Sequence, residues 1–268
     1  MRLVGLIQQI AHDLSGAKKI AADWPSLRTY AVDVFFHRLL RIVDVRSSDE
    51  ERAVRVKGGT EITYRRNRGD IYTLREIWID EIYLLPPGYT PDIVVDLGAH
   101  IGLASLWFAK TYRPSVIVAV EPARANAVLA RRNLERNGVC ANVVQVAVGR
   151  RDATELFREA RDSNKGRIDE IGVEVPCVTM GTLLKRLPEG REVDLMKIDV
   201  EGEEEQIFKG DLSWLARVRM IIAELHPNVI ESGLVARRLA EAGFRHVILE
   251  HPHAHETQCF VRQDVDLA

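Results

Sequence analysis

From residue 93 onward, short apolar runs alternate with longer segments of helical periodicity. Continuous apolar runs predict strands that are buried on both faces, and the segments between them predict helices. Strands are expected at 93–97, 116–120, 142–148, 194–199, 218–225, 244–250 and 257–263, and helices at 102–111, 123–137, 179–187, 203–209 and 228–242. Helical crossovers of this length make the strands parallel. The pattern therefore predicts an α/β fold with a doubly wound, mostly parallel, seven-stranded sheet.

The two ends of the chain depart from this alternation. Only a short polar loop, 251–256, separates the last two strands, so we expect them to form a terminal antiparallel hairpin. The first 60 residues are mainly helical in pattern, with a break at Trp24 and Pro25. We predict a helical N-terminal extension over 1–60, packed on the rest of the protein, and a second domain over 61–268.

Composition and charge narrow the classes of function. Lys and Arg total 37 against 39 Asp and Glu, and this near balance argues against a nucleic-acid-binding protein. Arg65, Arg66 and Arg68 form a local basic cluster, for which a solvated charged face is the simpler interpretation. No apolar run reaches the roughly 18 residues of a membrane-spanning helix. The three cysteines form no CxxC pair, so a reduced, cytoplasmic setting is expected.

The first strand and the loop after it carry the strongest local signal. The segment 93–105 reads I-V-V-D-L-G-A-H-I-G-L-A-S, with Gly98 suited to a sharp turn and Gly102 to close packing of the next helix. His100 interrupts the G-x-G-x-x-G pattern, and Asp96 would repel a phosphate but suit an ammonium group. A nucleoside ligand with an amino-acid end and no phosphate fits these residues, and S-adenosylmethionine is such a ligand. The alternative is a packing turn without a ligand.

An acidic residue ends the second strand of the same predicted sheet. Glu121 follows the run 116–120 and lies 23 residues after Gly98, where a carboxylate is placed to accept hydrogen bonds from ribose hydroxyls. Pro122 then begins the next helix. The alternative for Glu121 is a carboxylate favoured by the helix dipole alone.

Five motifs together resemble the FkbM-type S-adenosylmethionine-dependent methyltransferases. They are D-L-G-A-H-I-G (96–102), V-A-V-E-P (118–122), V-Q-V-A-V-G (144–149), D-L-M-K-I-D-V-E-G (194–202) and I-A-E-L-H-P (222–227). The resemblance covers about two-thirds of the chain. It implies a Rossmann-like class I methyltransferase fold, with 61–268 as the S-adenosylmethionine-binding domain, and O-methylation of a natural product, sugar or glycolipid component.

The resemblance also implies roles for individual residues. The methionine end of the cofactor would be held by Asp96, Gly98, Ala99, His100 and Gly102, and the ribose by Glu121 beside Pro122. The adenine would lie against Gln145, Val146 and Ala147. At His100 and Gln145 many family members have Asn, so the hydrogen bonds at these two positions do not transfer.

Methyl transfer to a hydroxyl needs alignment of the reacting atoms and removal of a proton. Asp199 ends the fourth strand of the main alternation, so we expect it near the sulfonium, with Glu201 on the same side. His226, after the fifth strand, is the best candidate for the general base. The alternatives are an N-cap role for Asp199, a buried carboxylate partner for Lys197, and a structural role for His226.

A metal-assisted mechanism is the rival within O-methyltransferases. Asp199, Glu201, Glu224 and His226 are of the types that bind Mg²⁺. The histidines of 251–255 are better explained by a solvated hairpin turn, and we predict no metal.

Other classes of function remain open. An RNA or N-methyltransferase is disfavoured because I-D-V-E replaces the tetrapeptide that grips a planar amine, and a catalytically silent scaffold is the alternative outside enzymes. The acceptor is expected to be a small molecule or carbohydrate, bound by the N-terminal segment and residues 70–90. Another wall of its site is expected from 158–172, a long, polar and mobile loop.

Overall fold

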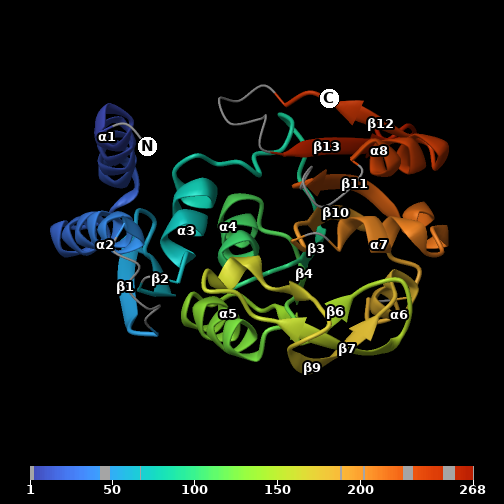
Figure 1. Ribbon diagram of the computed structural model, residues 1–268. Coiled ribbons are helices and arrows are strands. Elements are labelled where there is room, and N and C mark those ends of the chain that lie inside the picture. Colours follow the sequence, from blue (N-terminus) through green and yellow to red (C-terminus); the bar gives the residue numbers. More distant parts are fainter. Residues whose placement is uncertain are drawn as a thin grey trace.

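A seven-stranded sheet forms the centre of the computed structural model, which describes residues 3–42, 49–66, 68–187, 189–201, 203–225, 232–249 and 257–267. The strand order is β12-β13-β11-β10-β3-β4-β5 (Figure 1). The strands are β3 (Ile93–Leu97), β4 (Val116–Val120), β5 (Asn142–Val144), β10 (Val193–Ile198), β11 (Val218–Ala223), β12 (Phe244–Val247) and β13 (Gln258–Arg262). All neighbours from β5 to β11 are parallel, whereas β13 is antiparallel to both β11 and β12. The predicted sheet with its terminal antiparallel hairpin is confirmed.

Helices cover both faces of this sheet because alternate strand residues point into two separate cores. Val94 of β3 packs in one core with α4 and α5, whereas Val95 packs in the other with α6, α7 and α8. The helices are α4 (Leu103–Thr111), α5 (Arg124–Arg136), α6 (Met180–Leu184), α7 (Glu204–Lys209) and α8 (Ser232–Glu241), with a 3₁₀ turn η2 (Ser213–Arg217) before β11. The fold is therefore doubly wound, as predicted.

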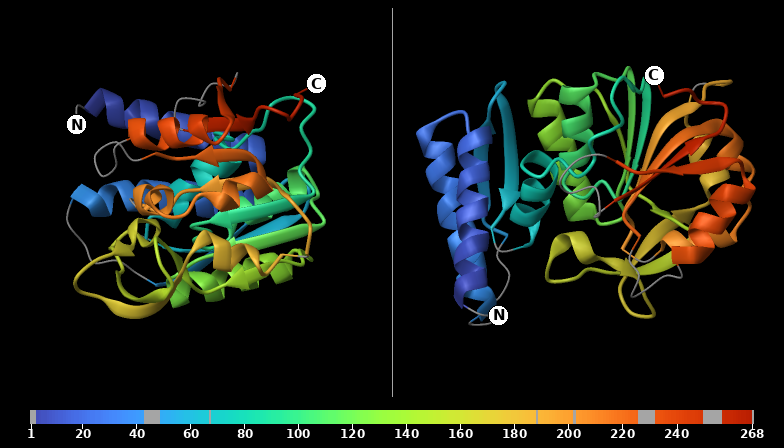
Figure 2. Two further views of the ribbon diagram at one scale, coloured as in Figure 1. Left: turned by 90° about the vertical axis from the view of Figure 1, so that its right-hand side faces the viewer. Right: turned by 90° about the horizontal axis from the view of Figure 1, so that it is seen from above.

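The N-terminal segment forms a helical pair and a hairpin. They comprise α1 (Leu3–Ile20), α2 (Trp24–Ile42), β1 (Glu51–Val56) and β2 (Thr60–Arg65), followed by α3 (Asp70–Trp78). Figure 2 shows the hairpin between the helical pair and the central part of the molecule. The boundary predicted after residue 60 lies within the hairpin that β1 and β2 form. The division into two domains stays a prediction.

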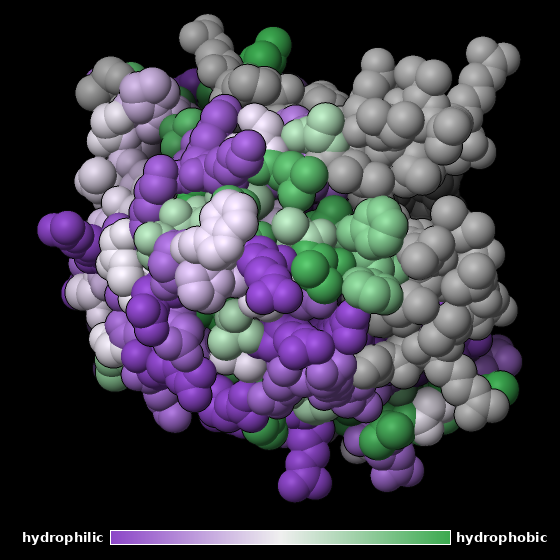
Figure 3. All heavy atoms as spheres, turned by 90° about the vertical axis from the view of Figure 1, so that its left-hand side faces the viewer, coloured by the Kyte–Doolittle hydropathy of each residue, from purple (hydrophilic) through white to green (hydrophobic). Residues whose placement is uncertain are grey.

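The outer face of α2 carries exposed apolar side chains. They include Trp24, Phe35 and Phe36, and apolar and charged residues are interspersed on this face of the molecule (Figure 3). Among the described residues, no helix combines the length and the apolar character that crossing a membrane requires.

A second, four-stranded sheet departs from the prediction. It has the order β6-β9-β7-β8, from β6 (Ala147–Val148), β7 (Ala153–Arg158), β8 (Arg167–Ile168) and β9 (Val173–Val178). The strand predicted at 142–148 is thus two strands, because the chain turns after Val144 and Ala147 pairs with Cys177 of β9. The predicted loop 158–172 is also wrong in part, since it contains β8 and the 3₁₀ turn η1 (Ser163–Lys165).

Candidate active site

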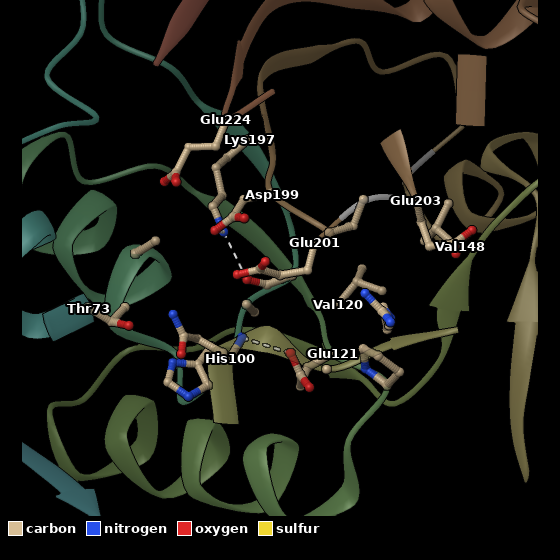
Figure 4. A pocket seen from close by; sticks show the side chains of 18 of the residues that line it. Thr73, His100, Val120, Glu121, Val148, Lys197, Asp199, Glu201, Glu203 and Glu224 are labelled. Atoms are coloured by element: carbon tan, nitrogen blue, oxygen red, sulfur yellow. Dashed lines mark hydrogen bonds and ion pairs between the residues drawn. The ribbon is translucent and has the colours of Figure 1, made fainter. Parts of the chain in front are cut away.

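A cleft of about 940 Å³, including open solvent, lies at the carboxyl ends of β3, β4, β10 and β11. This is where ligands of open parallel sheets bind. Nine of the predicted site residues line it: Gly98, Ala99, His100, Glu121, Pro122, Val146, Ala147, Asp199 and Glu201 (Figure 4). Residues of α3, of the segment after it and of the second sheet complete the lining.

The glycine loop, residues 98–102 between β3 and α4, fits against the end of β10, and at Gly98 there is no space for a side chain. A Cβ on Gly98 would lie 1.7 Å from the carbonyl oxygen of Asp199, and Gly98 has a φ of 74°. The Gly98 and Ala99 amides both donate to the Val120 carbonyl, at 3.0 and 2.9 Å, which ties the loop to β4. A Cβ on Gly102, which has a φ of 82°, would lie 3.1 Å from Ala130 of α5, and Gly102 is not part of the cleft lining.

Glu121 is buried and held by three donors. Its Oε2 accepts from the His100 amide at 2.9 Å, and its Oε1 accepts from the Ala123 amide at 2.9 Å and from Asn126 Nδ2 at 3.1 Å. Burial raises the pKa of this carboxyl, and the nearby His100 opposes the rise. A carboxylate has about four acceptor positions, so roughly one stays available toward the cleft.

The imidazole of His100 belongs to a buried polar cluster that no sequence motif indicates. His100 Nε2 lies 2.6 Å from Ser163 Oγ and 3.1 Å from Asp70 Oδ1. Arg65 is only 5% exposed and donates from Nε to Asp70 Oδ2 at 3.0 Å and from a guanidinium nitrogen to Asn126 Oδ1 at 2.7 Å. The interpretation of Arg65 as part of a solvated face is therefore wrong, because a buried carboxylate compensates its charge.

A buried ion pair supports the glycine loop from below. Asp96 is fully buried, accepts from Ser105 Oγ at 2.6 Å and lies 3.1 Å from Lys197 Nζ. Lys197 donates to the Gly98 carbonyl at 2.8 Å. Burial disfavours the charged amine, but Asp96 and Asp199 outweigh it and raise the pKa of Lys197. Asp96 therefore stabilises the loop from behind the cleft lining. Lys197 pairs with a buried carboxylate, which is the alternative role considered for it from the sequence.

Acidic groups meet a phenol at the other end of the cleft. The Tyr83 hydroxyl donates to Glu224 Oε1 in a short hydrogen bond, and Asp199 Oδ2 lies 3.4 Å from it. Glu201, at a φ of 53°, extends toward the same space as Asp199 (Figure 4). From the sequence, Tyr83 is placed only within residues 70–90, the segment expected to bind the acceptor, since no linear motif relates it to Glu224.

Some predicted residues lie elsewhere. Gln145 is half-buried and is not among the residues that line the cleft. His226 and the histidines of 251–255 lie outside the described residues. Within the described residues, no three His, Cys, Asp or Glu side chains are grouped so that they could hold a metal ion, and the absence of a metal stays a prediction.

Known proteins are similar to this chain in sequence. The FkbM methyltransferase domain matches residues 96–246. The chain is 30% identical to the 31-O-demethyl-FK506 methyltransferase FkbM of Streptomyces tacrolimicus, over 76% of this chain and 93% of that protein. It is 27% identical to Methyltransferase 1 of Beauveria bassiana, over 66% of this chain and 82% of that protein, and 27% identical to Methyltransferase sdnD of Sordaria araneosa, over 57% and 73%. The chain therefore belongs to the FkbM methyltransferase family.

Proposed function

We propose that the protein transfers the methyl group of S-adenosylmethionine to a hydroxyl of a small-molecule or carbohydrate acceptor. The observation that carries the proposal is the contact of Gly98 with the main chain of Asp199, which leaves a closely fitted loop at the floor of the cleft. Asp199 Oδ1 is buried and has no hydrogen-bond partner among the described residues, as suits a carboxylate that meets a cationic ligand. Carboxylates also outnumber cations in the cleft lining, which suits a positively charged cofactor.

The cofactor would occupy the length of the cleft. Main-chain groups of Ala99 and His100 would hold its methionine end, and Glu121 would accept from the ribose. Val146 and Ala147 are buried apolar residues against which the adenine would pack. When bound, the cofactor supplies a methyl group activated by the sulfonium charge, so the protein has to position the acceptor and take its proton.

The acceptor would enter beside Tyr83 and Glu76, where the N-terminal part of the chain meets the sheet. Thr73 lies in this wall, and its Oγ1 is buried without a hydrogen-bond partner among the described residues, so an acceptor hydroxyl bound there would satisfy it. We propose Asp199 and Glu201 as catalytic residues with His226, and the position of Glu224 adds it to the candidates for the base. O-methylation is further supported by the relative from S. tacrolimicus, whose name describes methylation at an oxygen.

Two alternatives have less support. An RNA acceptor is disfavoured because the cleft lining is rich in carboxylates, which repel a phosphate backbone. A silent scaffold is disfavoured because the acidic groups beside Tyr83 are arranged around an opening rather than neutralised within the core.

Calorimetric titration with S-adenosylhomocysteine tests the cofactor site. We expect micromolar binding by the metal-stripped protein, and a loss of about 1–3 kcal/mol in Glu121→Ala because charge-assisted hydrogen bonds disappear. Glu192→Ala, at an exposed carboxylate outside the cleft, is the matched control. Failure of the folded protein to bind, with or without Mg²⁺, would contradict the proposal.

The chemistry of the acceptor needs a separate measurement. Methyl-labelled S-adenosylmethionine is offered with paired hydroxyl and amine forms of small molecules and with RNA, and products are identified by mass spectrometry. An ether product is expected, and a product methylated only at nitrogen would contradict O-methylation.

A further inference from the structure

Two carboxyl groups compete for one phenolic proton at the acceptor end of the cleft. The Tyr83 side chain is buried, and its hydroxyl lies within reach of both Glu224 Oε1 and Asp199 Oδ2. A phenol has a single proton to donate, so it satisfies one carboxylate well and the other poorly. The geometry favours Glu224 as the acceptor of that proton, because Asp199 Oδ2 is at 3.4 Å, and Asp199 Oδ1 also has no hydrogen-bond partner among the described residues.

The surrounding charges do not neutralise both carboxylates. Lys197 Nζ lies 3.1 Å from Asp96 and 3.6 Å from Asp199, so this one cation is shared between two carboxylates before Glu224 is considered. Burial, Asp199 and Glu76 raise the pKa of Glu224 well above its usual value, and Tyr83 and Lys197 only partly oppose the rise. One additional positive charge beside Asp199 would therefore favour the ionisation of Glu224.

Building on the proposed function, we propose that Glu224 holds a proton in the cofactor-free protein and releases it when a sulfonium group binds beside Asp199. An opposite charge within about 4–6 Å lowers a carboxyl pKa by about 1 to 3, which is enough to change the protonation of such a group. S-Adenosylhomocysteine lacks this charge, so Glu224 keeps its proton when the thioether binds.

This coupling makes Glu224 a base only when the methyl donor is present. Glu224 takes the proton as the O–H bond of the acceptor breaks and the acceptor oxygen forms its bond to the methyl carbon. The carbon–sulfur bond breaks with its electron pair staying on sulfur. The loss of the sulfonium charge and the neutralisation of the Glu224 carboxylate occur together, so the net charge of the site is unchanged. After the reaction, Glu224 is protonated and the thioether product occupies the cleft.

Proton release on binding tests the inference without any turnover. S-Adenosylmethionine and S-adenosylhomocysteine are each titrated by calorimetry, near pH 7, in buffers of different ionisation enthalpy. We expect S-adenosylmethionine to release about 0.5 to 1 proton more than S-adenosylhomocysteine. The difference should disappear in Glu224→Gln. It should persist in Glu203→Gln, a matched control because Glu203 lines the same cleft and burial raises its pKa to about 6.

The outcomes separate this inference from the proposed function. Equal proton release by the two ligands in the unaltered protein overturns it, as does a difference that disappears in Glu203→Gln instead of Glu224→Gln. Binding of neither ligand contradicts the proposed function itself.

A second measurement needs no variant. Because binding of the sulfonium releases a proton, its affinity relative to the thioether should rise by up to about tenfold per pH unit below the pKa of Glu224. A constant affinity ratio from about pH 5.5 to about pH 8.5 overturns the inference, since the release must appear in that range if Glu224 is the base at neutral pH.

Discussion

Among single residues, Gly98 is the position where the structure tolerates change least. Its φ of 74° is unfavourable for other residues, and a Cβ would overlap the Asp199 carbonyl at 1.7 Å. We expect Gly98→Ala to weaken S-adenosylhomocysteine binding at least about tenfold and to lower the free energy of unfolding by more than the roughly 1–2 kcal/mol of backbone strain alone. Calorimetry and denaturant unfolding measure the two effects.

Gly58 provides the control for this variant. It has a φ of 81° in the turn between β1 and β2, where a Cβ would meet no other part of the described chain within 4 Å. Gly58→Ala should therefore show the strain without the overlap and keep its affinity for the ligand. Equal binding by the two variants would disprove the role assigned to the Gly98 contact.

The residues predicted from sequence share one physical property. Gly98, Glu121 and Asp199 each follow a parallel strand, and the carboxyl ends of parallel strands meet at one edge of the sheet. Tyr83 and Ser163 were not predictable in this way. Their partners, Glu224 and His100, are 141 and 63 residues distant in the chain, and the packing of the segment after α3 and of η1 brings them together.

At the scale of elements, strand burial decided how well each boundary was predicted. Residues of β3 and β4 are buried on both faces, and their continuous apolar runs matched the predicted limits. Strands β7 and β9 are partly exposed and carry charged residues, so they lack that signal. The turn η1 is ordered through polar contacts, including donation from the Ser163 amide to the Arg68 carbonyl at 2.7 Å.

The polar contacts that hold Ser163 of η1 against His100 and Asp70 depend on the charge of Asp70. Burial opposes its ionisation, but His100 and Arg65 outweigh burial and hold the pKa of Asp70 below its usual value near 3.8. We expect Asp70→Asn to lower the free energy of unfolding by about 3–5 kcal/mol at neutral pH, because Arg65 loses its buried partner. Denaturant unfolding near pH 7 measures this difference.

The sign of the pH dependence follows from the lowered pKa. The stabilisation by Asp70 is complete above the pKa of the unfolded chain and declines as the pH falls below it. The advantage of the unaltered protein over Asp70→Asn should therefore shrink between about pH 5 and about pH 3. Asp92→Asn, at an exposed ion pair with Arg191, should change stability by no more than about 1 kcal/mol. A stability difference between the two proteins that does not change with pH would rule out stabilisation by the ionised Asp70 carboxylate.

At the scale of the whole molecule, α5 joins the N-terminal hairpin to the central sheet. Asn133 accepts from the Thr63 amide at 2.9 Å and donates to the Thr63 carbonyl at 2.9 Å, and Asn137 makes the equivalent pair with Glu61. One helical turn of four residues advances about 6 Å and two strand residues about 7 Å, so the two side chains match the edge of β2. They satisfy backbone groups that an edge strand leaves open.

This attachment predicts that the hairpin and the central sheet unfold together and that Asn133 couples them. Asn133 is fully buried and also donates to the Ile101 carbonyl at 2.9 Å, next to the glycine loop. Asn133→Ala should lower the free energy of unfolding by about 2–4 kcal/mol, since buried groups on Thr63 and Ile101 lose their partner. Asn137→Ala, at the partly exposed end of the same edge, should lose about 1 kcal/mol. Amide hydrogen exchange at Thr63 measures the coupling directly. In the unaltered protein, exchange of this amide should be limited by global unfolding, and in Asn133→Ala it should be faster than global unfolding. Equal protection in both proteins would mean that the hairpin is held by its apolar contacts alone.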